Sequence, residues 1–267
     1  MKKPAWVIEK ERARRAAAAE TVWLFGLHAV RDALANPRRE RLRLVLTPNA
    51  AQRLDDLAGM EPEIVDPRKF DRHVGLPADS VHQGAALEVR PLEWGRLADL
   101  CAGGPETTVV LLDRVSDPHN VGAILRSAEV FGARAVIAPA RHSAPETGAL
   151  AKTASGALER QPYLRVRNLS EAMEELREMG FLLVGLAGEA EADLETALGQ
   201  ASGRPLALVL GAEGPGLREK TRETCDLLAR IPFAGAFGSL NVSNAAAVAL
   251  YAASRRTPAQ AAITSLR

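Results

Sequence analysis

The sequence predicts an α/β protein with a small α/β/α N-terminal domain and a larger C-terminal domain built on a parallel sheet. Three observations support this fold class. Short apolar runs alternate with helical patterns beyond residue 107, as in a sheet covered on both faces. A weakly patterned stretch containing Pro91, Gly103, Gly104 and Pro105 separates these runs from the strand and helix patterns of residues 21–90. The 267 residues are enough for two domains that each bury a core.

These patterns divide the chain into four segments. Residues 1–20 are rich in Lys, Arg, Glu and Ala, and we expect a mobile or weakly helical basic extension there. Residues 21–90 form the predicted N-terminal domain, 91–106 the linker and 107–267 the C-terminal domain. In the N-terminal domain the patterns predict helices at 27–36, 50–58 and 68–74, and strands at 41–46, 63–66 and 84–89.

The C-terminal domain alternates strands and helices in a regular order. The expected strands lie at 109–112, 135–138, 181–186, 206–210 and 229–232. The expected helices lie at 121–131, 169–179, 217–225 and 242–253, and a further helix is expected to begin near residue 147. Because the strands are apolar throughout rather than alternating, they favour a parallel sheet with helices on both faces.

Composition excludes several classes of partner. The formal net charge is +1, so nucleic-acid binding would need local basic patches rather than a global field. Cys101 and Cys225 indicate free thiols in a reducing cytoplasm, and the five histidines lack metal-ligand spacing, so we expect no metal. No apolar run approaches the roughly 20 residues that span a bilayer, and no secretory signal is apparent. We expect a cytoplasmic protein with no membrane partner.

Three polar, glycine-containing loops follow predicted strands. They cover residues 113–122, 211–216 and 233–244. In an open parallel sheet, ligands bind beyond the carboxyl ends of the strands, so these loops would meet on one rim if their strands are neighbours. Each loop also has an ordinary explanation: a turn with a helix N-cap at Asp117 to Asn120, a tight turn at 211–216, or capping by Ser239 and Asn241. The coincidence of all three favours a site.

The residue types in these loops narrow the chemistry. No Ser–His–Asp or Cys–His arrangement is apparent, and neither are paired carboxylates for glycoside hydrolysis. The glycine spacing at 211–216 matches neither the dinucleotide fingerprint nor a P-loop. What remains is a set of polar side chains with glycine-lined backbone: Asn120, Arg126, Glu213, Ser239 and Asn241. Such a set suits positioning a polar ligand and group transfer from a reactive cofactor.

The three loops with their flanking elements, at 111–128, 208–217 and 231–246, resemble the three motifs of the SpoU-type (SPOUT superfamily) RNA ribose methyltransferases. Residues 152–157, Lys-Thr-Ala-Ser-Gly-Ala, resemble an intermediate segment of that family. Residues 21–90 resemble the L30e-like domain that many members carry, through residues 25–30 and 82–84. With this architecture the chain resembles the bacterial enzymes that methylate a guanosine in the peptidyl-transferase region of 23S rRNA. Asn244 departs from the Val that many members have there.

The resemblance implies a cofactor, a site and an assembly. The cofactor would be S-adenosylmethionine (AdoMet), contacted by backbone at Gly211, Ile231 and Leu240, with Leu210 and Gly216 beside them. The catalytic set would be Arg126, Asn120, Glu213, Ser239 and Asn241. The family also implies a C-terminal trefoil knot, which the general rarity of knots would not predict, and a homodimer with cofactor sites near the subunit interface.

A ribose 2′-hydroxyl is a poor nucleophile at neutral pH, so catalysis must position it and favour its alkoxide-like form. Arg126 is the first choice for contact with that hydroxyl or its adjacent phosphate. Because an Arg pKa exceeds about 12, we prefer an electrostatic role, and a role as base stays open. For RNA contact, the clustered arginines of the N-terminal domain are Arg38, Arg39, Arg41 and Arg43. The alternative for this charge run is a solvated face.

Three rival functions stay open at this point. The target could be tRNA or another rRNA nucleotide. The chain could be an RNA-binding module without catalysis, although it retains Asn120, Arg126, Glu213 and Asn241. A nucleotide-dependent oxidoreductase is disfavoured because the dinucleotide fingerprint is absent.

Overall fold

The computed structural model describes residues 21–76, 80–234 and 240–256, and the chain divides into two compact units. Unit 1 comprises residues 1–93 together with 146–159, and unit 2 comprises 94–145 and 160–267. The predicted extension at 1–20 and Ser239 lie outside the described residues. Segment 146–159 thus joins the N-terminal unit although it follows the first strands of the C-terminal one.

Unit 1 is built on a sheet with strand order β1-β4-β2-β3. Its strands are β1 (Val22–Phe25), β2 (Arg41–Leu46), β3 (Glu63–Ile64) and β4 (Ala85–Val89). Its helices include α2 (Leu27–Ala35), α3 (Pro48–Ala51), the 3-10 helix η1 (Pro67–Lys69) and α4 (Phe70–Val74). Strand β1 was not predicted, although its residues are apolar. It pairs antiparallel with β4, and so does β2, while β2 and β3 run parallel.

Segment 146–159 carries α7 (Gly148–Ala154) and most of α8 (Ala157–Arg160). Helix α7 packs on β1 and α2. Gly148 makes this approach possible, because a Cβ on it would lie 2.2 Å from Cδ1 of Phe25 and 2.7 Å from the carbonyl oxygen of Trp23. A side chain at position 148 would therefore push α7 away from β1.

Unit 2 contains a seven-stranded parallel sheet with strand order β7-β6-β5-β10-β8-β11-β9 in the described part of the chain. Its strands are β5 (Thr108–Asp113), β6 (Ala135–Pro139), β7 (Tyr163–Val166), β8 (Leu182–Leu186), β9 (Ala192–Asp193), β10 (Leu206–Gly211) and β11 (Leu227–Arg230). The predicted α/β class and the parallel sheet are confirmed. In β5 and β10, at the centre of the sheet, Leu206 pairs with Thr108 and Gly211 with Asp113, so both strands end at the same level.

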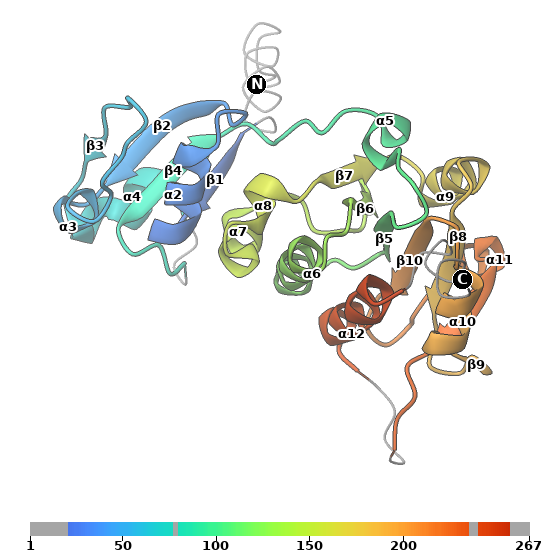
Figure 1. The fold of residues 1–267 in the computed structure, drawn as a ribbon. Coiled ribbons are helices and arrows are strands. Elements are labelled where there is room, and N and C mark those ends of the chain that lie inside the picture. The colour runs from blue at the N-terminus through green and yellow to red at the C-terminus, as the bar shows by residue number, and fades with distance from the viewer. Residues whose placement is uncertain (1–20, 77–79, 235–239, 257–267) are drawn as a thin grey trace, which may run out of the picture. The chain divides into compact units, whose positions relative to one another are not determined.

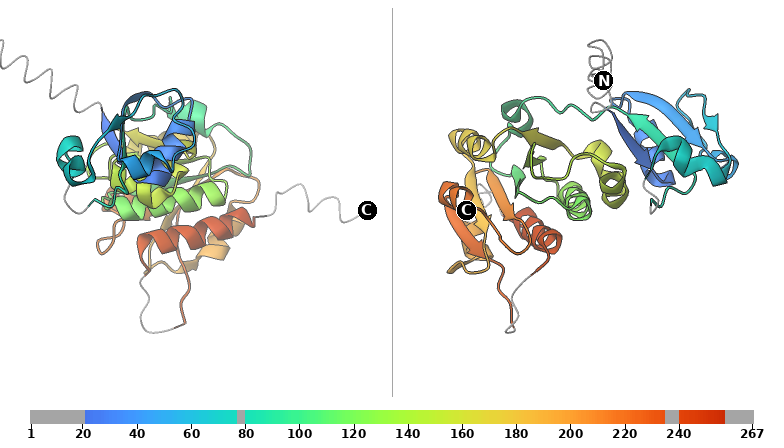
Figure 2. Two further views of the ribbon diagram at one scale, coloured as in Figure 1. Left: turned by 90° about the vertical axis from the view of Figure 1, so that its left-hand side faces the viewer. Right: turned by 180° about the vertical axis from the view of Figure 1, so that it is seen from behind.

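Helices cover both faces of this sheet (Figure 1). One face carries α5 (Leu97–Cys101), α9 (Leu169–Glu178) and α11 (Glu219–Thr224), and the other α6 (Pro118–Val130), α10 (Leu194–Gln200) and α12 (Val242–Ser254). Helices α6 and α12 lie side by side in every view (Figure 2). Helix α12 is thus next to α6 although α6 ends at Val130 and α12 begins at Val242.

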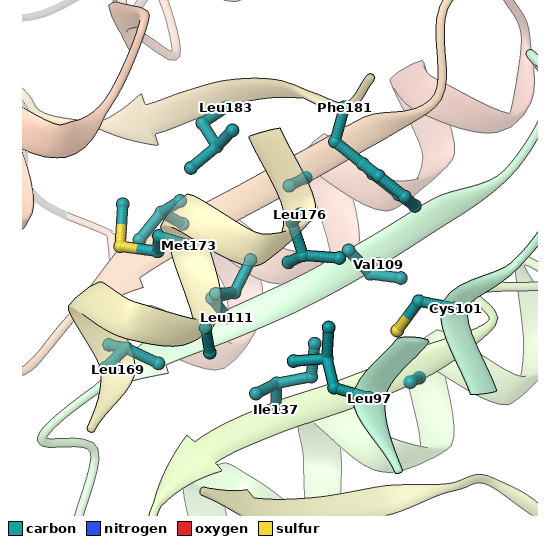
Figure 3. Close-up of a cluster of buried hydrophobic side chains, with 14 of the residues drawn as sticks. Leu97, Cys101, Val109, Leu111, Ile137, Leu169, Met173, Leu176, Phe181 and Leu183 are labelled. Carbon is teal, nitrogen blue, oxygen red and sulfur yellow. The ribbon is translucent and has the colours of Figure 1, made fainter. Parts of the chain in front are cut away.

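The core under α9 shows why this face is dry. Leu169, Met173 and Leu176 project from α9 onto Val109 and Leu111 of β5 (Figure 3). Their spacing is the apolar stripe of an amphipathic helix, which is the pattern that predicted this element. At about 25 cal/mol per Å² of apolar surface, such burial is the main force that holds helix and sheet together.

Several elements escaped the sequence analysis. Strand β7 has the pattern Tyr-Leu-Arg-Val, in which Arg165 interrupts the apolar run because the strand lies at the sheet edge. Helix α5 lies inside the stretch predicted as a linker, and it buries Leu97 and Cys101 against the sheet. Helix α10 and the two-residue strand β9 were also missed.

Candidate functional site

A pocket of about 800 Å³ opens at the carboxyl end of the parallel sheet. Its walls come from the segments that follow β8, β10 and β11, together with the start of α12. Strands β10, β8 and β11 are neighbours in the sheet in that order, and β5 lies on the other side of β10. The pocket therefore occurs where the strand-end rule places ligands, and its size falls in the usual range for small-molecule sites.

Three of the predicted side chains form one hydrogen-bonded cluster beside this pocket. Nδ2 of Asn120 donates to Oε1 of Glu213 at 3.0 Å. Nδ2 of Asn241 donates to Oδ1 of Asn120 at 3.0 Å and also to Oε1 of Glu213. One carboxylate oxygen thus holds two amides, which come from the starts of two different helices. The three loops meet as the strand-end rule predicts, and this result is independent of any role assigned to the residues.

Capping explains how the two amides are aimed. Asp117, not Asn120, caps α6, because its Oδ1 accepts from the backbone N–H of His119 at 2.9 Å. Buried Asn120 is therefore available to Glu213. Asn241 caps α12 through its Oδ1, which accepts from the N–H of Ser243 at 2.9 Å. Its amide nitrogen is left to face the cluster, so one side chain does both tasks.

The glycine loop after β10 folds back on itself. The N–H of Gly216 donates to the carbonyl of Ala212 at 2.9 Å, and Gly214 and Gly216 have φ values of 81° and 68°, which favour glycine. A Cβ on Gly211 would lie 2.1 Å from the carbonyl carbon of Gly216. The loop can close in this way only with glycine at position 211.

Asp113 anchors the far end of that loop, and the sequence analysis missed this contact. Its carboxylate is buried at the end of β5 and accepts from Nε of Arg218 at 2.6 Å and from the backbone N–H of Arg218 at 2.9 Å. An acidic residue that directly ends an apolar strand was the available signal. Its partner lies 105 residues later, which no local pattern indicates.

The residues expected to contact the cofactor all line the pocket: Leu210, Gly211, Gly216, Ile231 and Leu240. Charged side chains lie among the same walls. Arg222 pairs with Glu189, and both line the pocket. Arg230 also lines it, and its Nε lies 2.9 Å from Oδ1 of Asp193, which is not a lining residue. A hydrogen bond from its own backbone and the pairing with Arg222 lower the pKa of Glu189. The pocket thus combines an apolar, backbone-lined interior with a charged wall.

Arg126 does not join this cluster. It lies on α6 six residues after Asn120, is exposed, and is not among the pocket-lining residues. Six residues correspond to about 9 Å of rise and a rotation of about 240°, so Arg126 leaves the helix on a different side from Asn120. The structure separates Arg126 from Asn120, Glu213 and Asn241 within one chain.

The four arginines expected to bind RNA differ strongly. The expectation that Arg39 contacts RNA is corrected. Its side chain is fully buried and paired with Glu146 and Glu159, so it is not accessible to a phosphate. Arg43 is exposed but pairs with Glu63 at 3.0 Å and lies over the ring of Trp23. Arg38 is exposed at the same turn.

Arg41 is partly buried, and its Nη1 donates to the carbonyl of Leu34 at 2.6 Å, near the end of α2.

Among the described residues, no group of three His, Cys, Asp or Glu side chains could hold a metal ion. In the same part of the chain, no helix is long and apolar enough to cross a membrane. Cys101 and Cys225 are free thiols.

Family models match both parts of the chain. The model described as RNA 2′-O ribose methyltransferase substrate binding matches residues 23–95, and the model described as SpoU rRNA Methylase family matches residues 107–251. The chain belongs to the SpoU rRNA methylase family. The resemblance noted from the three motifs is thereby confirmed.

Similar SpoU proteins cover almost the whole chain. A 23S rRNA (guanosine-2′-O-)-methyltransferase RlmB of Vibrio vulnificus (strain CMCP6) is 40% identical over 244 residues, which are 88% of this chain and 96% of that protein. The RlmB protein of Ralstonia nicotianae (strain ATCC BAA-1114 / GMI1000) is 41% identical over 239 residues, which are 87% of this chain and 95% of that protein.

Solved SpoU structures share the fold. The SpoU methyltransferase AviRb of Streptomyces viridochromogenes, in complex with the cofactor AdoMet, has a TM-score of 0.73 and 26% identity, covering 91% of this chain and 92% of that one. An AdoMet-bound rRNA methyltransferase of Sinorhizobium meliloti has a TM-score of 0.74 and 25% identity, covering 91% and 90%.

The pocket fits AdoMet, the cofactor of the SpoU family. Leu210, Ile231 and Leu240 line the pocket and would offer apolar surface to an adenine ring, and the glycine backbone beside them would offer polar groups to its edge. Glu213 places a carboxylate beside the pocket, which suits a cationic sulfonium. The charged wall suits the ammonium and carboxylate of a methionine group.

Proposed function

We propose that this chain methylates the ribose 2′-hydroxyl of a guanosine in 23S rRNA, with AdoMet as the methyl donor. The observation that carries the proposal is the Asn120–Glu213–Asn241 cluster beside the pocket at the sheet's carboxyl end. The guanosine and the 23S rRNA come from the names of relatives about 40% identical over most of the chain. We further propose that residues 21–90 bind the RNA and residues 107–267 carry the catalytic site.

When bound, AdoMet supplies an electrophilic methyl group, so the protein's task is placement and charge. Glu213 fixes Asn120 and Asn241 through one oxygen, which sets the shape of the polar side of the pocket. The closed glycine loop leaves the backbone at Gly211 in the pocket lining, where it would hold the cofactor. Together these residues would orient the cofactor and the 2′-hydroxyl for transfer, which would lower the entropic part of the barrier.

Arg126 is proposed to act on the RNA from outside the pocket wall. Its exposure leaves the guanidinium accessible to the target phosphate or hydroxyl, where a positive charge favours the alkoxide-like form. Arg126→Ala should lower kcat by about 10²-fold or more while the AdoMet Kd stays within about twofold. Arg167→Ala removes another exposed arginine at the opposite sheet edge and serves as the control. Near-normal turnover of Arg126→Ala would remove Arg126 from the mechanism.

Tritium transfer from labelled AdoMet tests the function directly. The substrates are 23S rRNA from cells that lack the gene, 23S rRNA from cells that contain it, and unmodified tRNA. Incorporation into the first alone, followed by mapping of the methylated nucleotide, is the expected result. Incorporation into tRNA alone would reassign the substrate. AdoMet binding without transfer to any of the three would favour a non-catalytic RNA-binding module.

We also propose a homodimer, a trefoil knot and a cytoplasmic location. The dimer is supported by large apolar side chains that remain exposed on adjacent helices: Val130 on α6, and Val248 and Tyr251 on α12. The knot is supported by the return of the chain from β11 to α12, which contacts both α6 and β10. A cytoplasmic location follows from the proposed rRNA substrate.

A further inference from the structure

We propose that Arg114 and Arg141, in the loops that follow β5 and β6, form a basic rim that binds the phosphate backbone of the substrate RNA beside the pocket. That the ligand is RNA rests on the proposed function. The basic rim lies wholly within unit 2. Neither arginine lines the pocket or belongs to the hydrogen-bonded cluster next to it, so this surface is separate from the site described above.

The two loops leave the sheet at the same edge. Strands β5 and β6 are parallel neighbours, so their carboxyl ends lie side by side. Strand β5 also pairs with β10, where Asp113 lies opposite Gly211, and Gly211 lines the pocket. Arg114 therefore follows directly after a residue that adjoins the pocket wall, and Arg141 extends the same edge by one strand.

Both loops have an unusual backbone conformation where they carry these cations. Arg114 has a φ of 61°, and His142, the residue after Arg141, has a φ of 62°. Among the described residues of unit 2, these are the two non-glycine residues with a left-handed backbone. That conformation brings Cβ close to the following carbonyl oxygen, so it persists only where surrounding contacts fix it, and it is most frequent at functional sites.

Contacts from β7 fix the loop that carries Arg141. Nη2 of Arg165 donates to the carbonyl of Ala140 at 2.6 Å, and Nη1 donates to the carbonyl of Ala144 at 3.1 Å. The hydroxyl of Tyr163 donates to the same carbonyl of Ala144 at 2.7 Å. These bonds hold both ends of the loop against the sheet, while Arg141 between them is exposed.

A hydrogen bond joins this loop to the one after β5. The backbone N–H of Ala144 donates to the carbonyl of Val115 at 3.3 Å. Val115 and Asp113 are both buried, and Arg114 between them is exposed. The two arginines therefore stand on one connected surface whose backbone is already ordered. Such preorganisation lowers the entropic cost of binding a ligand.

Neither cation of the basic rim is neutralised by the protein. In the described part of the chain, the guanidinium groups of Arg114 and Arg141 have no carboxylate within ion-pair distance and no hydrogen bond. Arg218 and Arg230 of the same unit, by contrast, both pair with carboxylates. Asp117, in the same loop as Arg114, is engaged in capping α6. Two exposed guanidinium groups with free donors match the oxygens of phosphate groups, which lack donors of their own.

The basic rim ends before the edge strand β7. The loop after β7 carries Arg167, which is also exposed. There Asn168 caps α9 and donates to Glu171 at 2.9 Å, so a carboxylate stands beside that loop. The same loop has no left-handed residue. Arg167 is therefore a matched control at the same edge of the sheet.

The salt dependence of RNA binding tests the basic rim. The double variant Arg114→Gln/Arg141→Gln of the full chain removes both charges, and the probe is 23S rRNA from cells that lack the gene. Each lost phosphate contact reduces the slope of log K against log salt by about 0.7–0.9, so the slope should flatten by about 1.5. Arg114→Lys/Arg141→Lys keeps the charges and should keep most of the slope. Arg167→Ala should show the parental slope.

Kinetics separate a binding surface from the catalytic machinery. In Arg114→Gln/Arg141→Gln the KM for 23S rRNA should rise about tenfold, because binding is weakened. The kcat at saturating RNA and the AdoMet Kd should stay within about twofold, since the pocket is untouched. An AdoMet Kd that rises tenfold with an unchanged slope would place the arginines at the cofactor and refute the basic rim.

A parental slope in Arg114→Gln/Arg141→Gln would overturn the proposal, and so would equal flattening in Arg167→Ala, which would indicate an unspecific field. If Arg114→Gln impairs folding, Arg114→Gly removes the same charge, because glycine accepts the left-handed backbone, and the same slopes decide. A parent that does not bind 23S rRNA would also overturn the basic rim. A parent that binds it without methylating it would count against the proposed function, while the slopes would still judge the basic rim.

Discussion

At the scale of single residues, the site depends on one oxygen with two donors. Oε1 of Glu213 accepts from the amides of Asn120 and Asn241, and Oδ1 of Asn241 simultaneously caps α12. The two tasks of Asn241 use different atoms of its amide: Nδ2 donates within the cluster, and Oδ1 caps the helix. The two tasks can therefore be separated by chemistry at that residue.

Asn241→Asp separates them. The carboxylate still accepts from the N–H of Ser243, so the cap of α12 is kept and the melting temperature should change little. The donor to Asn120 and Glu213 is replaced by an acceptor, and the cluster then contains facing oxygens. We expect methyl transfer to 23S rRNA to fall by about 10²-fold. Asn241→Ala, by contrast, should also lose about 1 kcal/mol of cap stability in thermal unfolding. Equal turnover of Asn241→Asp and the parent would show that the amide is dispensable.

Gly211→Ala should prevent the glycine loop from closing. The added Cβ would lie 2.1 Å from the carbonyl carbon of Gly216, and backbone there cannot move aside cheaply. Titration calorimetry should show a loss of AdoMet affinity of at least about tenfold. Gly199→Ala is the matched control, because nothing lies within 4 Å of its Cβ and α10 should gain about 0.5–1 kcal/mol. An unchanged AdoMet Kd in Gly211→Ala would mean that the loop adjusts.

The residues that sequence patterns placed well are those next to strand ends. Asn120, Glu213 and Asn241 were brought together by one rule about parallel sheets, without knowledge of any side-chain contact. Arg39 shows the limit of such rules. Its neighbours Arg38 and Arg41 look the same in the sequence, but its carboxylate partners lie 107 and 120 residues away. A run of arginines gives no sign of which member turns inward.

At the scale of elements, apolar strands and amphipathic helices followed from their periodicity, and edge elements did not. Strand β7 carries Arg165 because its outer side has no neighbouring strand, so its pattern resembles a loop. Segment 146–159 was predicted as a helical part of the C-terminal domain, yet its contacts belong to unit 1. Periodicity indicates that a face is buried, but not which surface covers it.

The turn between α2 and β2 is the element proposed to meet phosphate. Arg38 is exposed and Arg41 is partly buried, whereas Arg39 is fully buried, so the double variant is made at Arg38 and Arg41. In Arg38→Ala/Arg41→Ala, the slope of log K for RNA against log salt should flatten by about one to two units. Filter binding across a salt series measures this slope. Arg96→Ala should leave it unchanged, and an unchanged slope in the double variant would restore the solvated-face explanation.

At the scale of the whole molecule, the topology, meaning the order in which the strands and helices are connected in space, does not follow from the sequence patterns. The strand order β5-β10-β8-β11 and the packing of α12 on α6 both join segments far apart in the chain. The same strands and helices can be connected in many topologies, and the general rarity of knots would have predicted an open, unknotted sheet. Family resemblance, rather than periodicity, raised the expectation of a knot.

Helices α6 and α12 also carry the exposed apolar residues of the proposed dimer interface. Val248 and Tyr251 lie three residues apart on one face of α12, and Tyr251 packs edge-to-face on Phe131, which directly follows α6. In a two-fold interface each substitution occurs twice, so Val248→Lys/Tyr251→Lys would bring four like charges together. We expect this variant to sediment as a monomer and the parent as a dimer. Ile64→Lys, at an equally exposed apolar residue of β3, should remain a dimer. A monomeric parent, or a dimeric double variant, would move the interface elsewhere or remove it.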